Sequence, residues 1–396
     1  MSKFISLLLV CSPFLLLCNA SISGRPYGTF EHPAARARPR FRYWLPDASV
    51  DPSTVQNDIR SAANLGIGGI ELLPFYNYGG GTPVVDWVKY GFGTPAFNRI
   101  FRAALETHRE CGLYMDFAMG PNQGQGVPAE TDNPGLQWDL RTYSTIVSED
   151  APFSHSIPGW GSGDLIAAVS ALVLSETEKS IPPRAGQGPP YNYTRLVLQH
   201  DSLTDLTDSV SKTGALSFSP PAHNTSGHYR IFASYQVLTH AKNLDPDTNA
   251  TNTIFDNGCY IVDHFDGKGA QVVTDFWDRY ILVNGIKELL SEAGNSGWED
   301  SMELLSNVSW SPSLPARFEE RWGYSIKPYV PLIIFGNNNI NIQSAEPGEL
   351  QCVLDTEDEG MGYVNAYRSS LRDGYAEYLN VFTNWTQSAL QLQHSS

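Results

Sequence analysis

The stretch Ile67-Gly68-Gly69-Ile70-Glu71-Leu72-Leu73-Pro74 is a short apolar run that directly follows a helical pattern ending at Gly66. A run of this length, rich in branched apolar residues and preceded by glycine, is typical of a buried strand. The earlier run Phe41 to Leu45 has the same character, and between the two runs Asp51 and Pro52 are residue types that begin a helix. The order strand, helix, strand indicates a parallel sheet covered by helices.

The same unit recurs along the chain. Residues 94–112 form a second helical pattern, which begins with Thr-Pro and ends at Gly, and residues 113–119 form a third apolar run. Helical periodicity returns over residues 272–290 before a fourth strand, and the alternating residues 390–396 are a fifth. We therefore predict an α/β fold with about the first five βα units of a (β/α)8 TIM-type barrel. A sheet ending there has two unpaired edges, so we expect a fragment of a longer protein.

The chain divides into four predicted parts. Residues 1–20 combine a positive start, an apolar core and small residues at the expected cut, which predicts an N-terminal signal peptide. The first part of the barrel follows in residues 21–134. Residues 135–255 alternate polar and apolar positions between turn-rich segments, which predicts an inserted β-rich module. Residues 256–396 continue the barrel and end early.

Composition narrows the classes of partner. The chain has 42 Asp and Glu against 26 Lys and Arg, and its formal net charge of −16 argues against a nucleic-acid partner. The signal peptide and five Asn-X-Ser/Thr triplets indicate secretion and glycosylation, with no membrane contact once the signal is cleaved. Beyond the signal peptide, Cys111, Cys259 and Cys352 permit at most one internal disulfide. Their scattered spacing disfavours a structural zinc site.

Three carboxylates lie within five residues of the segment Gly297-Trp298-Glu299-Asp300-Ser301-Met302-Glu303, directly after the fourth predicted strand. In a βα barrel the residues at the carboxyl ends of the strands face the active-site mouth, so an acidic cluster there indicates chemistry. Acidic residues at such a junction also cap the next helix, and the sequence leaves that alternative open. Glu71 and Asp116 lie inside apolar strands, so each must be paired or face a polar pocket.

The chain resembles glycoside hydrolase family 106, which comprises α-L-rhamnosidases and related secreted proteins. The resemblance covers most of residues 40–396, with the β-rich module in the expected place. It is carried by short motifs, namely Phe41-Arg42-Tyr43-Trp44-Leu45-Pro46-Asp47, Gly68-Gly69-Ile70-Glu71, Asp300-Ser301-Met302-Glu303, Arg321-Trp322-Gly323-Tyr324 and Tyr329-Val330-Pro331. The family pattern has an aromatic residue where this chain has Met302, which leaves the identity of the sugar open.

The resemblance implies a barrel with β-sandwich domains, an inverting mechanism and a calcium ion near the sugar. Glycosidic cleavage requires one carboxylic acid and a second carboxylate. Glu303 matches the family's glutamate and is the expected acid, and Glu299 is the alternative. Expected sugar contacts are Glu71, Asp116 and Asp300, with Trp44, Tyr76, Tyr78 and Trp298 as stacking surfaces. Asp47 and Asp300 are expected calcium ligands.

Each of these residues also has a structural alternative. Asp47 and Asp300 are the residue type that caps helices, and most aromatic residues in such a barrel belong to its core. His264 beside Asp263 is a weaker candidate, because such pairs are usually structural. The leading functional hypothesis is a secreted glycoside hydrolase acting on a rhamnose-containing glycan. The alternative is a non-catalytic carbohydrate-binding protein or an inactive truncated fragment, since no strand remains to supply a second catalytic carboxylate.

Overall fold

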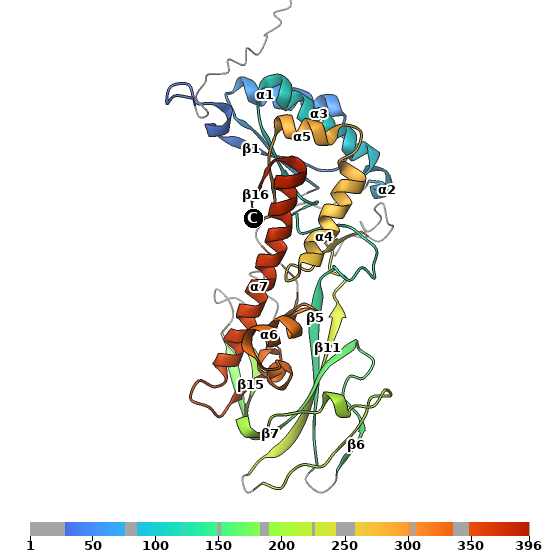
Figure 1. The fold of residues 1–396 in the computed structure, drawn as a ribbon, viewed down its shortest axis with the longest axis vertical. Helices are drawn as coiled ribbons and strands as arrows, with labels where there is room; N and C mark the ends of the chain where they lie inside the picture. The colour runs from blue at the N-terminus through green and yellow to red at the C-terminus, as the bar shows by residue number, and fades with distance from the viewer. Residues whose placement is uncertain are drawn as a thin grey trace, which may run out of the picture.

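A computed structural model describes residues 28–75, 85–122, 124–148, 152–182, 190–223, 226–242, 258–300, 302, 304, 306–335 and 348–395. The molecule is elongated, with a helix-covered parallel sheet at one end and an antiparallel sheet at the other (Figure 1). One long helix, α7 (Met361–Trp385), runs between the two ends. The predicted signal peptide lies outside the described residues.

A five-stranded parallel sheet, curled into a half-barrel, positions the predicted acids. Its strand order is β1 (Arg40–Leu45), β2 (Gly69–Pro74), β3 (Met115–Ala118), β13 (Gly294–Trp298) and β16 (Gln393–Ser395). Every neighbouring pair is parallel. The five predicted strands are therefore present and lie side by side in chain order.

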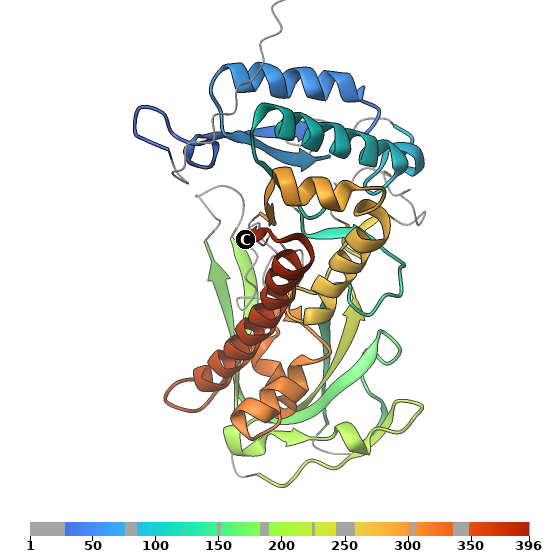
Figure 2. The same cartoon turned by 45° about the horizontal axis from the view of Figure 1, so that its top comes forward.

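Three helices cover one face of this sheet, namely α1 (Pro52–Asn64), α3 (Pro95–Cys111) and α5 (Ile286–Ala293) (Figure 2). The predicted caps are in place, because the Asp51 carboxylate accepts from the Ser53 amide at 2.8 Å and the Thr94 hydroxyl accepts from the Phe97 amide at 3.3 Å. Gly112 ends α3 in the left-handed conformation, with φ of 65°. The buried core between helices and sheet includes Ile59, Ile70, Leu72, Phe97, Phe101, Met115 and Phe117.

The helical pattern over residues 272–290 is not one helix. It comprises α4 (Gly267–Phe276), a single π-helical turn over Trp277–Ile281 and the separate helix α5. The break falls at Asn284 and Gly285, which both have positive φ, so the chain changes direction before it enters β13. Trp277 in the π turn is fully buried, and its indole nitrogen donates to the Met119 carbonyl at 2.6 Å, which ties the turn to the end of β3.

The β-rich module contains a seven-stranded sheet. Its path is β14 (Ser309–Trp310), β5 (Trp138–Ile146), β11 (His228–Leu238), β7 (Asp164–Ile181), β8 (Tyr191–Leu198) and β15 (Leu350–Leu354), with β9 (Thr204–Asp205) paired to β7. A separate two-stranded antiparallel sheet of β6 (Phe153–Ser156) and β10 (Ala215–Phe218) contributes to a smaller core on one face. Strands β4 (Gly126–Pro128) and β12 (Cys259–Ile261) form a separate pair.

The predicted boundary at residue 255 does not separate the two sheets. Strands β14 and β15 come from the part assigned to the barrel, yet they pair with β5 and β8 of the module. Helix α6 (Leu314–Trp322) and the 3-10 helix η6 (Lys327–Ile333) pack into the module's core as well. The reason is burial, since their apolar residues fill the module's main core.

Helix α7 belongs to both cores. Val364, Tyr367 and Leu371 in its first half are buried in the module's core, whereas Tyr378 and Phe382 are buried against the parallel sheet. A π turn, η7 (Thr386–Leu390), then leads into β16. The helix therefore joins the two parts and fixes where the last strand can enter the sheet.

The remaining helical turns are short: η1 (Ala35–Ala37), α2 (Trp87–Tyr90), η3 (His200–Ser202) and η4 (Thr207–Ser209). Cys111, Cys259 and Cys352 form no disulfide with one another. No helix in the described part of the chain is both long enough and apolar enough to cross a membrane.

Candidate functional site

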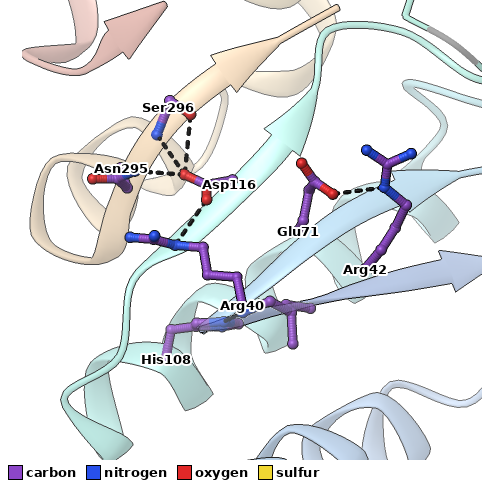
Figure 3. A network of polar contacts seen from close by, with 8 residues as sticks. Arg40, Arg42, Glu71, His108, Asp116, Asn295 and Ser296 are labelled. Atoms are coloured by element: carbon purple, nitrogen blue, oxygen red, sulfur yellow. Dashed lines mark hydrogen bonds and ion pairs between the residues drawn. The ribbon is translucent and has the colours of Figure 1, made fainter. Parts of the chain in front are cut away.

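The face of the parallel sheet opposite its helices carries a row of polar side chains. Strand pairing places Arg42 beside Glu71, Glu71 beside Asp116, and Asp116 beside Ser296. Because alternate strand residues point to opposite faces, these four side chains share the face that the helices leave uncovered. Charged groups from three strands are therefore brought into contact on this face, as Figure 3 shows.

Asp116 connects three strands at the centre of this row. Its Oδ1 accepts from the Asn295 amide at 2.7 Å, the Ser296 backbone amide at 3.1 Å and the Ser296 hydroxyl at 3.0 Å. Its Oδ2 lies 2.8 Å from Nε of Arg40 on β1 (Figure 3). The residue is buried, and these contacts use both of its oxygens. Asp116 therefore has a structural role in the sheet. Its predicted contact with a sugar stays a prediction.

Arg42 links Glu71 to the acidic segment after β13. Its Nε donates to Glu71 Oε2 at 2.6 Å and its terminal nitrogen lies 3.3 Å from Asp300 Oδ2. The hydrogen bond that Arg42 donates to Glu71 is the main reason that the pKa of Arg42 is raised above its ordinary value. The three side chains are between 28% and 39% exposed, so solvent or a ligand reaches them. We call Arg42, Glu71 and Asp300 the rim triad.

The aromatic candidates have different surroundings. Trp298 is only 5% exposed, packs with Leu73 and Ala118, and lies under the Arg42 guanidinium at 4.9 Å from the ring centroid. A sugar has no access to a ring in that position, and the cation–π contact instead holds Arg42 in place. Trp44 is 48% exposed on the same face of β1. Tyr76 and Tyr78 lie outside the described residues.

Glu299 lies next to Asp300 in sequence but in a different environment. It is 5% exposed, and its Oε1 accepts a hydrogen bond from the Tyr378 hydroxyl on α7. Burial raises the pKa of Glu299 to about 8, against the opposing effect of the Tyr378 hydrogen bond. His264, the weaker candidate, lies in the same buried group, with Nε2 3.8 Å from Glu299 Oε1.

Glu303 lies outside the described residues, whereas its two neighbours on the chain do not. Met302 is half-buried and Leu304 is buried in the module's core. Farther along the same segment, the backbone amides of Asn307 and Val308 donate to the buried carboxylate of Asp139, at 3.1 Å and 2.8 Å. The segment that carries the predicted acid is therefore fixed at one end by β13 and at the other by Asp139.

The predicted calcium ligands do not form a binding set. Asp47 is buried, and its Oδ1 accepts from the Ser49 amide at 2.7 Å, while Asp300 is paired with Arg42. Within the described ranges, no group of three or more His, Cys, Asp and Glu residues could hold a metal ion. Calcium normally takes six to eight oxygen ligands, so the residues described here do not fit the ion that the resemblance implies.

A cavity of about 550 Å3 lies away from the rim triad, in the β-rich module. Its lining comes from β5, from residues next to β8 and β15, and from the segment after the acidic cluster, and it includes Tyr143, Tyr191, Asn307 and Glu349. None of the predicted site residues lines it.

Sequence reasoning missed three residues that organise the site, namely Arg42, Asp139 and Tyr378. Arg42 did leave a signal, because it alternates with Arg40 in a strand that pairs with the one carrying Glu71. Tyr378 left none, because it reaches Glu299 from a helix 79 positions away. The approach of α7 to β13 depends on tertiary packing alone.

Comparison with known proteins gives support at the level of fold. No protein-family profile matches the chain, and no curated protein sequence matches it. Among solved structures, the chain is similar to a rhamnosidase from Novosphingobium sp. PP1Y, with a TM-score of 0.60 and 15% sequence identity. The match covers 92% of this chain and 46% of the rhamnosidase, so the chain spans about half the length of that enzyme.

Proposed function

We propose that this chain is a secreted glycoside hydrolase of the α-L-rhamnosidase type, related to glycoside hydrolase family 106, and that its five-stranded sheet is part of a TIM-type barrel. One observation carries the proposal: the rim triad and Trp44 lie on the open face of a parallel sheet, in a fold similar to that of a rhamnosidase. Active sites of barrel enzymes lie at the carboxyl ends of such strands, and within the triad Asp300 has that position, two residues beyond the end of β13.

The rim triad suits a neutral sugar. Glu71 and Asp300 present carboxylate oxygens that accept hydrogen bonds from sugar hydroxyls, and Arg42 presents guanidinium donors to ring or hydroxyl oxygens. Because Arg42 is already paired with two carboxylates, its positive charge is balanced and no anionic group on the substrate is required. Trp44 supplies an exposed ring for the apolar face of the sugar.

For the chemical step we propose Glu303 as the general acid, on the strength of its match to the family motif. Hydrolysis with inversion needs a second carboxylate that activates a water on the opposite face of the sugar, about 6.5–9.5 Å from the acid. Glu299 is the alternative acid, and its pKa of about 8 would keep it protonated at neutral pH. Its burial argues against this role, since an acid must reach the glycosidic oxygen.

A non-catalytic carbohydrate-binding protein is the second candidate. It is favoured by the ion pairing of the rim triad, since Glu71 and Asp300 are both held by Arg42 and are better placed to bind than to transfer protons. Such a protein would use the same sugar contacts without the second carboxylate.

We also propose that the protein is secreted, on the basis of the signal peptide. Three of the five glycosylation triplets fall within the described residues, and their asparagines Asn192, Asn307 and Asn384 are exposed, which supports the proposal. Asn224 and Asn249 lie outside the described residues. Edman sequencing of the protein recovered from culture medium tests it: a mature N-terminus near residue 21 is expected, and retention inside the cell would contradict secretion.

Hydrolysis of an aryl α-L-rhamnoside and calorimetric binding of L-rhamnose test the proposed function. We expect turnover by the wild-type chain and at least a hundredfold loss in Glu303→Gln with binding retained, because general acid catalysis contributes about 10²–10⁴-fold. Turnover that Glu303→Gln leaves unchanged would remove that residue from the mechanism. Binding without turnover in the wild-type chain would favour the carbohydrate-binding protein, and absence of both would refute the proposal.

Arg42→Met tests the site itself, because the substitution removes the group that joins Glu71 to Asp300. We expect rhamnose binding to weaken by tenfold or more. Arg60→Met is the matched control, since Arg60 is similarly exposed and pairs with Glu110 on the helix-covered side of the sheet. Equal effects of the two substitutions would show that the rim triad is not the sugar site.

A further inference from the structure

A buried polar cluster lies directly behind the rim triad and joins β13 to α7. Glu299 at the end of β13 accepts the Tyr378 hydroxyl hydrogen bond, and its own backbone amide donates to the Ser395 carbonyl of β16 at 3.2 Å. Its side chain is 3% exposed. Glu299 is also the chain neighbour of both Trp298 and Asp300, so its position determines how Asp300 meets Arg42.

His264 completes the cluster with a ring nitrogen that has no hydrogen bond. Its Nδ1 lies 2.8 Å from the Val262 carbonyl and must donate the proton there, which leaves Nε2 as a bare acceptor. Nε2 is buried without a hydrogen-bond partner and lies 3.8 Å from Glu299 Oε1, about 1 Å longer than an O–H···N hydrogen bond. The imidazole also stacks on the Tyr378 ring at 4.7 Å, which fixes its orientation.

The surrounding charges do not favour an ionised Glu299. Asp263 is buried beneath the cluster, where it accepts from the Phe265 amide at 2.8 Å, and Asp266 follows it on the chain. Tyr375 on α7 and Asp263 in the loop before α4 both contribute to raising the pKa of Tyr378. Arg317 donates to the Phe265 carbonyl and pairs with Glu377 at 2.7 Å, and Arg42 pairs with Asp300 and Glu71, so both of these guanidinium groups have carboxylate partners other than Glu299. Among the described contacts of Glu299, none is a permanent cation.

We propose that Glu299 is a positioning residue: a neutral carboxylic acid, hydrogen-bonded by Tyr378 and with its proton facing His264 Nε2, that clamps the carboxyl end of β13, and hence Asp300, against α7. The consequence for sugar binding rests on the proposed function, whereas the clamp itself does not. A neutral acid fits the burial, because a carboxylate could accept from Tyr378 but would leave its charge unpaired in a buried site, beside the lone pair of His264 Nε2 at 3.8 Å.

The pKa values agree with this geometry. Burial raises the pKa of Glu299 to about 8 and lowers the pKa of His264 to about 4, so both are neutral between these limits. Since the folded protein holds the Glu299 proton more tightly than the unfolded chain, its contribution to stability is full below about pH 4.5 and declines as pH rises towards 8. Burial raises the pKa of Asp263 as well, to about 7, so a comparison with a Glu299 variant is needed to separate the two.

Infrared spectroscopy of the intact chain tests the protonation state. Glu299→Gln keeps an acceptor for Tyr378, is neutral at every pH tested, and leaves Asp263 unchanged. The wild-type minus Glu299→Gln difference spectrum at pH 6 should contain a protonated-carboxyl C=O stretch. A difference spectrum with only carboxylate bands would overturn the proposal.

Chemical unfolding between pH 5 and 8 tests the linkage. The unfolding equilibrium constant of the wild type, divided by that of Glu299→Gln, should rise up to about tenfold per pH unit as pH increases. Glu292→Gln, which removes an exposed carboxylate on α5, is the matched control and should run parallel to the wild type. A Glu299→Gln profile that is also parallel to the wild type would overturn the proposal.

Rhamnose binding separates this inference from the proposed function. Glu299→Ala should weaken binding by more than tenfold, and Glu299→Gln should rescue most of that loss because it is neutral and preserves the acceptor for the Tyr378 hydroxyl. Equal losses in the two variants would contradict a positioning role. If the wild type binds no sugar, the proposed function fails, while the infrared and unfolding results still decide whether the clamp exists.

Discussion

Replacement of Asp116 by asparagine separates the two interpretations of that residue. If Asp116 only contacts the sugar, its replacement should lower the affinity for the sugar and leave the fold intact. As the centre of the polar row, it holds β1, β3 and β13 together through Arg40, Asn295 and Ser296. Asp116→Asn retains an oxygen for part of this network and removes the charge opposite Arg40. The structure therefore predicts a loss of stability.

The size of that loss follows from burial. The side chains of Arg40 and Asp116 are 22% and 12% exposed, so removing one partner leaves a largely desolvated charge. Breaking a buried ion pair in this way costs about 3–5 kcal/mol, and the residual exposure places the expected value near the lower end, about 3 kcal/mol. That is about a 150-fold increase in the unfolding equilibrium constant.

Urea unfolding of the wild type, Asp116→Asn, Arg40→Met and the double variant measures this energy. A double-mutant cycle should give a coupling of at least about 1.5 kcal/mol between the two side chains. A loss of under about 1 kcal/mol in Asp116→Asn, combined with weaker rhamnose binding, would refute the structural role and restore the sugar contact predicted from the sequence.

Two further predictions concern the cores. Burial lowers the pKa of His108 to about 4, and its Nε2 accepts from the Ile70 amide at 3.2 Å. The stability of the wild type should therefore fall by up to about 1.4 kcal/mol per pH unit as pH drops from 6.5 towards 4, and that of His108→Gln should fall less. Urea midpoints at pH 4.5 and 6.5 measure this, and an equal pH dependence in the two proteins would contradict it. Phe318→Ala should lower the free energy of unfolding by about 3–5 kcal/mol. It should also accelerate thiol labelling of Cys352, which lies in the same core, more than labelling of Cys111, which lies against the other core. Equal acceleration at the two thiols would contradict this and indicate that both cores unfold as one cooperative unit.

Local sequence signals predicted the elements of the parallel sheet well. Asp51 and Thr94 cap their helices as expected, and Gly112 ends α3, because capping depends on residues within one helical turn. Apolar runs marked β1, β2 and β3, whereas β13 was placed by its position after a helical pattern and β16 by the alternation of residues 390–396. Periodicity failed over residues 272–290, where one predicted helix is interrupted, because a continuous apolar face does not reveal where the backbone adopts positive φ.

The candidate site was predicted less completely than the fold. Glu71 and Asp300 do lie together, but the group that joins them, Arg42, was named only as part of a family motif and not as a site residue. Trp298 was expected to face a sugar and is instead covered by that same arginine. A strand pattern gives the face on which a side chain lies, whereas its partners depend on which strand becomes the neighbour.

The sequence by itself determined the order of strands and helices and the clustering of carboxylates after β13, because strand and helix periodicity and capping are properties of contiguous residues. Only the tertiary structure decided that Glu299 and Asp300, adjacent on the chain, enter opposite environments. One is buried against Tyr378 of α7 and the other meets Arg42 at the surface. The physical reason is that burial and charge pairing depend on segments distant in sequence, here α7 and β1, whose approach no local pattern specifies.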